Sequence, residues 1–143
     1  MKITQISVFL ENRKGRLHEV AALLGKSGIN IRALNIAETD DFGVLRLVVD
    51  NAAEALKVLK SGGFVASTTD IVAVEVGDRP GGLADVLRIL SVSGINIEYM
   101  YGFFEKKSDK AVLVFRFDDP DAAVAILNQN HVRIINEADV KDF

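Results

Sequence analysis

The residues of this chain that are best suited to bind a small molecule lie in two short turns that contain glycine. Residues 12–17 read Asn-Arg-Lys-Gly-Arg-Leu, and residues 78–83 read Asp-Arg-Pro-Gly-Gly-Leu. Each turn stands directly before a segment with helical apolar spacing, so its backbone N–H groups lie at a helix N-terminus, where anions bind. A glycine there also lets the backbone approach a ligand closely. The chemistry expected of both turns is binding of a carboxylate, with about 1.5–3 kcal/mol from each hydrogen bond to a charged group.

Two asparagines, Asn30 and Asn96, offer a second kind of polar contact. Each stands in a Gly-Ile-Asn-Ile segment that follows one of the helical segments. An Asn side chain presents both a donor and an acceptor, which suits the two charged ends of an α-amino acid. A purely structural interpretation stays open for both features: the glycines would serve only the turns, and the asparagines would satisfy backbone groups at the helix ends.

The two turns belong to an internal duplication, which sets the organisation of the chain. Residues 15–31 and 81–97 are identical at nine of seventeen positions, where chance would give about one match. The duplication predicts two domains, residues 1–69 and 70–143. Because units of this size bury little surface, we expect them to pack on each other or on a second chain, with a homodimer as one form.

The order of predicted elements in each copy is β-α-β-β-α-β. In the first copy the predicted strands are residues 2–10, 29–39, 44–49 and 64–68, and the predicted helices are residues 15–26 and 52–60. In the second copy the predicted strands are residues 71–76, 95–104, 111–117 and 132–135, the helices are residues 81–92 and 119–129, and residues 105–110 form a charged hairpin. This pattern predicts an α+β fold of two ferredoxin-like domains in tandem, each an antiparallel sheet with both helices on one face.

In a ferredoxin-like sheet the strand that carries Gly-Ile-Asn-Ile lies at an edge. An uncovered edge invites pairing, so we expect the two copies to join side by side through these edges. That join would bring Asn30 and Asn96 close to a pseudo-twofold axis.

The composition argues against several classes of function. The chain has 143 residues, a net charge of −3, no cysteine and two histidines, His18 and His131. These numbers leave no thiolate site and little material for a metal site or a Ser-His-Asp triad, so no catalytic residue, metal ligand or cofactor is predicted. A basic face for nucleic acid is missing, and no apolar run reaches the roughly 18 residues of a membrane span. We expect a cytoplasmic protein without nucleic-acid or membrane partners.

The motifs around the two turns resemble those of the ACT domain, a small regulatory module that binds amino acids. Asp78-Arg79-Pro80-Gly81-Gly82-Leu83 followed by Gly94-Ile95-Asn96-Ile97 is similar to the family's D/N-x-P-G-x-L turn and the strand after it. The first copy is also similar to the small regulatory subunit of acetolactate synthase and to the serine-binding domain of phosphoglycerate dehydrogenase. Asn12 and Asn30 of this chain stand at positions that match two ligand-contacting asparagines of that serine-binding domain.

This chain departs from those patterns at a few positions. Leu10 and Val76 stand where the serine-binding relative has a histidine, which implies an apolar ligand side chain, branched or aromatic. Lys14 replaces the usual proline of the first turn. Asp78 replaces Asn12 in the second copy and places a negative charge where a carboxylate would sit, so the first site is expected to be the better one.

The resemblance implies a non-enzymatic regulatory protein that binds a free amino acid between a turn of one domain and the asparagine-bearing edge of another. The partner it implies is an enzyme of amino-acid metabolism. The alternatives are a structural or interaction subunit with an empty ACT fold and, least favoured, an enzyme in its own right. The residues implied to bind the ligand are Asn12, Arg13, Lys14, Gly15, Arg16, Leu17, Asn30, Ile31, Asp78, Arg79, Pro80, Gly81, Gly82, Leu83, Asn96 and Ile97.

Overall fold

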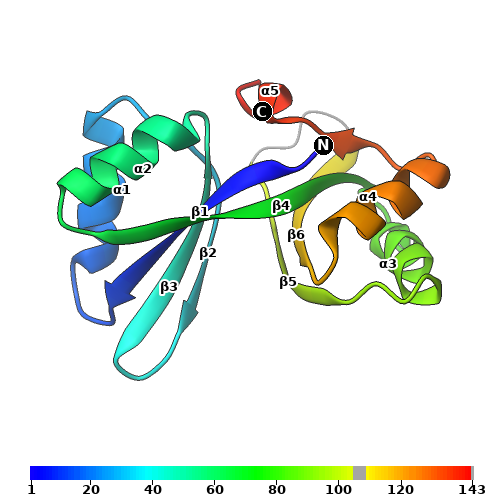
Figure 1. The fold of residues 1–143 in the computed structure, drawn as a ribbon, viewed down its shortest axis with the longest axis horizontal. Helices are drawn as coiled ribbons and strands as arrows, with labels where there is room; N and C mark the ends of the chain where they lie inside the picture. Colours follow the sequence, from blue (N-terminus) through cyan, green and yellow to red (C-terminus); the bar gives the residue numbers. More distant parts are fainter. Residues whose placement is uncertain (105–108, 143) are drawn as a thin grey trace. The chain divides into compact units, whose positions relative to one another are not determined.

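The computed structural model of the chain describes residues 1–104 and 109–142. They divide into two compact units (Figure 1). The first unit is Thr4–Thr69, and the second unit consists of Met1–Ile3 together with Asp70–Phe143.

The first unit is a four-stranded antiparallel sheet covered on one face by two helices (Figure 1). Its strands follow the order β2-β3-β1-β4. The elements are β1 (Ile3–Glu11), α1 (Arg16–Lys26), β2 (Ile31–Glu38), β3 (Phe42–Val49), α2 (Ala52–Ser61) and the first part of β4 (Val65–Gly77). Apolar residues at helical spacing face the sheet, so the core joins Val20, Leu24, Ala55 and Leu59 of the helices to Ile6, Val8, Leu45 and Leu47 of the strands.

The second unit repeats this architecture with the strand order β7-β4-β6-β5. Its elements are the rest of β4, α3 (Gly82–Val92), β5 (Ile97–Gly102), β6 (Lys110–Phe117), α4 (Pro120–Gln129), β7 (Ile134–Ile135) and α5 (Glu137–Val140). The core is built in the same way, with Phe115 and Phe117 stacked at 5.4 Å between ring centroids. The predicted fold class is confirmed, because each unit has a ferredoxin-like sheet with its two helices on one face.

One prediction about the strands is wrong. The expected strands at residues 64–68 and 71–76 form a single strand of 13 residues, β4, whose two parts belong to different units. The intervening residues Thr69 and Asp70 include no glycine or proline that would end a strand, and a β-branched residue such as Thr69 favours extended backbone.

The edge strands also differ from expectation. Among the described residues, β2 pairs with β3 alone and β5 pairs with β6 alone. The predicted join between the two Gly-Ile-Asn-Ile strands is not among the strand pairs of the described residues, where β2 and β5 each have a partner on one side only.

Smaller differences concern the ends of the chain and the hairpins. The helix α5 was not predicted, since its four residues carry no apolar period; a capping box between Asn136 and Asp139 begins it. The predicted hairpin at residues 105–110 lies mostly outside the described residues. No helix in the described part of the chain is long and apolar enough to cross a membrane.

Candidate ligand site

The two glycine turns have the same backbone conformation. Gly15 has φ 89° and Gly81 has φ 82°, in the left-handed region, and no side chain caps either helix. The first helical bond joins the Glu19 N–H to the Gly15 carbonyl at 3.0 Å, and Asp85 bonds to Gly81 in the same way. Arg16 and Gly82 donate their own N–H groups to the Arg13 and Arg79 carbonyls. The N–H groups of the next two residues of each helix point toward its N-terminus, where a carboxylate can accept from them.

A cavity of about 190 Å³ opens beside the first turn. Its apolar wall is formed by Leu10, Leu17 and Ile36, of which Leu17 is 42% exposed and Ile36 48% exposed. Leu17 therefore lies outside the core of the first unit. The remaining lining residues are Glu11, Asn12, Arg13, Arg16, Glu38 and Gly43. Charges of both signs around an apolar wall complement a small zwitterion with an apolar side chain.

The polar side chains of this cavity are held in place by the protein. The Arg13 guanidinium pairs with Glu11 at 3.2 Å, and Arg16 pairs with Glu19. The Arg16 guanidinium also lies 4.7 Å from the centre of the Phe64 ring. Such fixed guanidinium groups lose less freedom when an anion binds.

Asn12 has a role that the sequence did not indicate. Its side-chain nitrogen donates to the carbonyls of Thr39 and Asp40, at 3.3 and 3.4 Å. It thereby fixes the turn to the hairpin between β2 and β3. Asp78, its counterpart in the second unit, has no amide donor; its backbone N–H donates to the Asp109 carbonyl at 2.9 Å.

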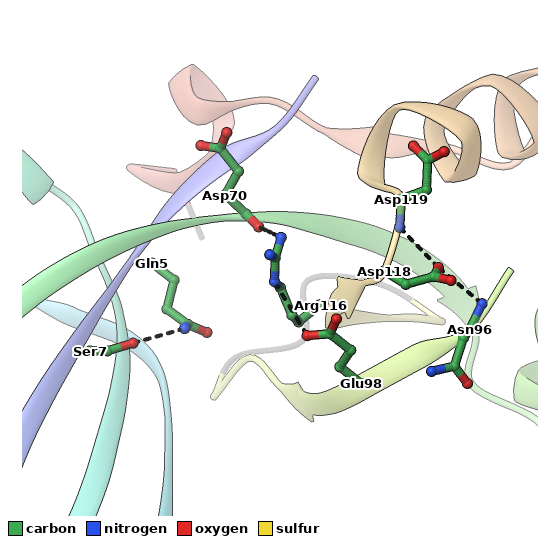
Figure 2. A network of polar contacts seen from close by, with 8 residues as sticks. All are labelled: Gln5, Ser7, Asp70, Asn96, Glu98, Arg116, Asp118 and Asp119. Atoms are coloured by element: carbon green, nitrogen blue, oxygen red, sulfur yellow. Dashed lines mark hydrogen bonds and ion pairs between the residues drawn. The ribbon is translucent and has the colours of Figure 1, made fainter.

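The backbone of Asn30 and of Asn96 is bonded by an aspartate in each unit. Asn30 donates its N–H to the Asp50 carboxylate at 3.0 Å, and Asp50 returns its own N–H to the Asn30 carbonyl at 3.1 Å. Asn96 and Asp118 make the same reciprocal pair, which Figure 2 shows with the Asn96 amide pointing away from the carboxylate.

This pairing leaves the asparagine side chains available. Both residues are exposed, and neither side-chain amide makes a hydrogen bond to any described residue. The structural interpretation, in which the amides satisfy the helix end, therefore does not hold for the side chains. The sequence analysis did not identify Asp50 and Asp118 as the partners of the two asparagines. A sequence signal for this role exists, because an aspartate stands directly before the helix cap in both units, before Asn51 and before Asp119.

Within one unit the two groups of implied site residues lie apart. In each unit an 11-residue helix, α1 or α3, lies between the glycine turn and the asparagine. A helix of this length is about 16 Å long. Asn12, Arg13, Arg16 and Leu17 line the cavity described above, and Lys14, Gly15, Asn30 and Ile31 do not.

In the second unit the implied residues are divided between two cavities. A shallow cavity of about 450 Å³ includes Asn96 and Ile97 at the end of α3. Another, of about 270 Å³, includes Arg79 and Gly82 near its start. Asp78, Pro80, Gly81 and Leu83 line neither of them. No group of three or more metal-binding side chains occurs among the described residues.

Comparison with known proteins places this architecture in a family. The family model described as an ACT domain pair matches residues 1–143. The chain belongs to this family. Among solved structures, protein BT0572 from Bacteroides thetaiotaomicron is 40% identical with a TM-score of 0.94, covering 100% of this chain and 98% of that one.

Two further relatives are enzyme subunits by name. The acetolactate synthase small subunit of Buchnera aphidicola subsp. Baizongia pistaciae (strain Bp) is 26% identical over 80 residues, which cover 55% of this chain and 50% of that protein. The match thus spans half the length of that relative. The regulatory subunit of aspartate kinase from Thermus thermophilus shares the fold at a TM-score of 0.63 and 21% identity, covering 88% of this chain and 91% of that one.

Proposed function

We propose that this protein is a regulatory ACT-domain protein that binds a free amino acid with a branched or aromatic side chain and passes the signal to an enzyme of amino-acid metabolism in the cytoplasm. The observation that supports it best is the first unit's cavity, where an uncapped helix N-terminus, an apolar wall and charges of both signs meet. Two relatives named as subunits of amino-acid-metabolism enzymes, one of them a regulatory subunit, support the same function.

The proposed ligand is oriented by its two charged ends. Its carboxylate accepts from N–H groups of the first turn of α1 and from Arg13 or Arg16. Its ammonium group lies toward Glu11 or Glu38, and its side chain contacts Leu10, Leu17 and Ile36. A few such bonds together with a small buried side chain give about −4 to −8 kcal/mol, the millimolar to micromolar range.

The proposed site is completed by an asparagine from another edge strand. The amides of Asn30 and Asn96 are exposed, and β2 and β5 each keep an unpaired edge among the described residues. In a homodimer an edge strand from the partner chain would bring its asparagine to the turn. The bound amino acid would then favour the dimer. The coupling free energy between ligand binding and dimer formation would be about 1–3 kcal/mol, and it would be available for signalling to the enzyme.

Calorimetric titration with each common amino acid tests the proposal, with thermal unfolding as a second readout. The expected result is stabilisation by a branched or aromatic amino acid, about 2.7 kcal/mol at a concentration one hundred times Kd. The double variant Asn30→Ala/Asn96→Ala should lose binding and keep its fold. Asn128→Ala, which removes an exposed helical asparagine, is the matched control. No response to any amino acid at millimolar concentration would overturn the proposal.

A second candidate, an interaction subunit that binds no ligand, is favoured by one observation in the second unit. Asp78 places a carboxylate in the turn where the ligand's carboxylate would lie. This candidate predicts a stable complex with an enzyme in a pull-down experiment, unchanged by amino acids and by the double asparagine variant.

A further inference from the structure

The second unit holds a cavity that the proposed function does not use. It has a volume of about 270 Å³ and lies between the start of α3, the edge of β4 beyond its pairing with β7, and the turn between α4 and β7. All of its lining residues belong to this one unit. The volume is enough for a compact metabolite.

In the first unit, large side chains occupy the positions that correspond to two lining residues of this cavity. The Val132 N–H bonds to the Leu127 carbonyl at 3.0 Å, as Phe64 bonds to Leu59. At the other wall Gly82 N–H bonds to Arg79, as Arg16 bonds to Arg13. Val132 and Gly82 are thus the counterparts of Phe64 and Arg16, whose guanidinium and ring lie 4.7 Å apart. Two large side chains in contact in the first unit correspond to a small one and a glycine in the second.

The glycine at this place cannot be exchanged for a larger residue. A Cβ atom at Gly82 would lie 1.9 Å from the Gly77 carbonyl oxygen. The start of α3 therefore lies directly against the backbone of β4, and no side chain from residue 82 can fill the cavity.

The lining of the cavity carries an excess of positive charge. Arg79, Lys110 and Arg133 are cationic, His131 lies beside them, and the carboxylates are Glu75 and Asp85. Each carboxylate is paired with one arginine: Glu75 with Arg133 at 3.2 Å and Asp85 with Arg79 at 2.8 Å. A guanidinium has five N–H groups, so these pairs orient both arginines and leave them further donors.

His131 adds an observation independent of charge. Its φ of 58° is in the left-handed region, and it is the one residue other than glycine with positive φ in the described part of the chain. The first unit has Gly63 with φ 86° at the equivalent position. His131 therefore lines the cavity from a backbone conformation that would favour glycine.

We propose that this cavity binds a compact oxyanion, a phosphate or carboxylate group of a small metabolite, at a site separate from the amino-acid pocket. Oriented guanidinium forks match both kinds of group. The site gives the second unit a ligand of its own, and this inference goes beyond the proposed amino-acid binding.

The test is calorimetric titration of the full chain with inorganic phosphate and with malonate, against sodium chloride of equal ionic strength. The two probes distinguish a phosphate from a dicarboxylate ligand. Binding of either one above the chloride control is the expected result. No binding of either probe at millimolar concentration overturns the proposal.

Variants that restore first-unit residues locate the site. Arg133→Val should weaken binding by about tenfold or more, because it removes a cation and leaves the Glu75 carboxylate unpaired. Val132→Phe should abolish binding by filling the cavity. His131→Gly relieves the left-handed conformation, so it keeps the fold while weakening binding. The control Arg88→Ala removes an exposed arginine of α3 that does not line the cavity and should leave affinity within about twofold.

Binding of either probe that survives both Val132→Phe and Arg133→Val would also overturn the proposal. The amino-acid response should be unchanged in these variants, since none of the substituted residues lines the first unit's cavity. Failure of this proposal and failure of the amino-acid proposal are therefore distinguishable.

Discussion

The two units keep the same backbone at the turn and open different cavities beside it. In the first unit the cavity lies on the side of β2 and is lined by Leu17 and Ile36. In the second unit it lies on the side of β7 and is lined by Arg133 and His131. The glycines Gly15 and Gly81 differ in φ by only a few degrees. Side chains, and not the turn itself, therefore decide which side of the helix start can receive a ligand.

The residue after the turn glycine accounts for part of this difference. Arg16 extends across the first unit's helix start toward Phe64, whereas Gly82 brings α3 against the backbone of β4. A duplication can thus diverge in ligand chemistry through a few positions while the hydrogen bonds of the scaffold are retained.

The largest expected effect is on stability, at Gly82. Gly82→Ala should lower the free energy of unfolding by more than about 3 kcal/mol, because its Cβ would overlap the Gly77 carbonyl and the helix start must move. Urea denaturation measures the loss. Gly25→Ala, where the Cβ meets nothing within 4 Å, is the control and should stabilise α1 by about 0.5–1 kcal/mol. A cost at Gly82 no larger than at an exposed site would contradict the close contact.

The equivalence of the two turns predicts equal effects of Gly15→Ala and Gly81→Ala. Each should cost about 1–2 kcal/mol, since both glycines have left-handed φ. Urea denaturation of the two single variants measures both costs. Costs that differ by more than the experimental error would show that the turns are not equivalent.

A double-mutant cycle between Arg16→Ala and Phe64→Leu sharpens the contrast at the helix start. The coupling energy should be about 0.5–1 kcal/mol for the guanidinium over the ring. The same cycle with Arg13→Ala in place of Arg16→Ala should give no coupling, because Arg13 pairs with Glu11 instead. Equal coupling in both cycles would rule out a specific contact.

The smallest expected effect is the exchange of turn residues between the units. Lys14→Pro should stabilise the protein by about 0.4–1 kcal/mol, since Pro80 occupies the same position of a turn with the same conformation. Pro80→Lys should lower stability by a similar amount. Thermal unfolding of both variants measures the exchange, and destabilisation by Lys14→Pro would show that the first turn differs locally.

Much of the fold could be predicted from the sequence because the signals are local. The apolar spacing of Val20 and Leu24 defines a helix face, and Gly28, with φ 73°, follows the end of the helix in the left-handed conformation that glycine favours. The absence of a glycine or proline at Thr69 and Asp70 is a local signal for the continuity of β4, but the strand's partners β1, β6 and β7 lie far along the chain and could not be predicted in the same way.

The candidate site was only partly predictable for the same reason. The turn glycines are local signals, but Ile36, Glu38 and Gly43 reach the cavity through strand pairing, in which Leu10 stands opposite Gly43. Likewise, nothing near Arg16 indicates that its contact is Phe64. Such register and packing follow from the assembled sheet and not from any single segment.

The continuous strand β4 has a consequence for how the chain tolerates change. Ala66 belongs to the first unit's core and Val72, Val74 and Val76 to the second, so every one of these positions is even-numbered. Insertion of one residue between Thr69 and Asp70 would shift this phase, and one of the two hydrophobic interiors would receive the wrong set of side chains. Insertion of two residues would keep the alternation of buried and exposed side chains along β4. It would lengthen the strand between the two units without exchanging its two faces.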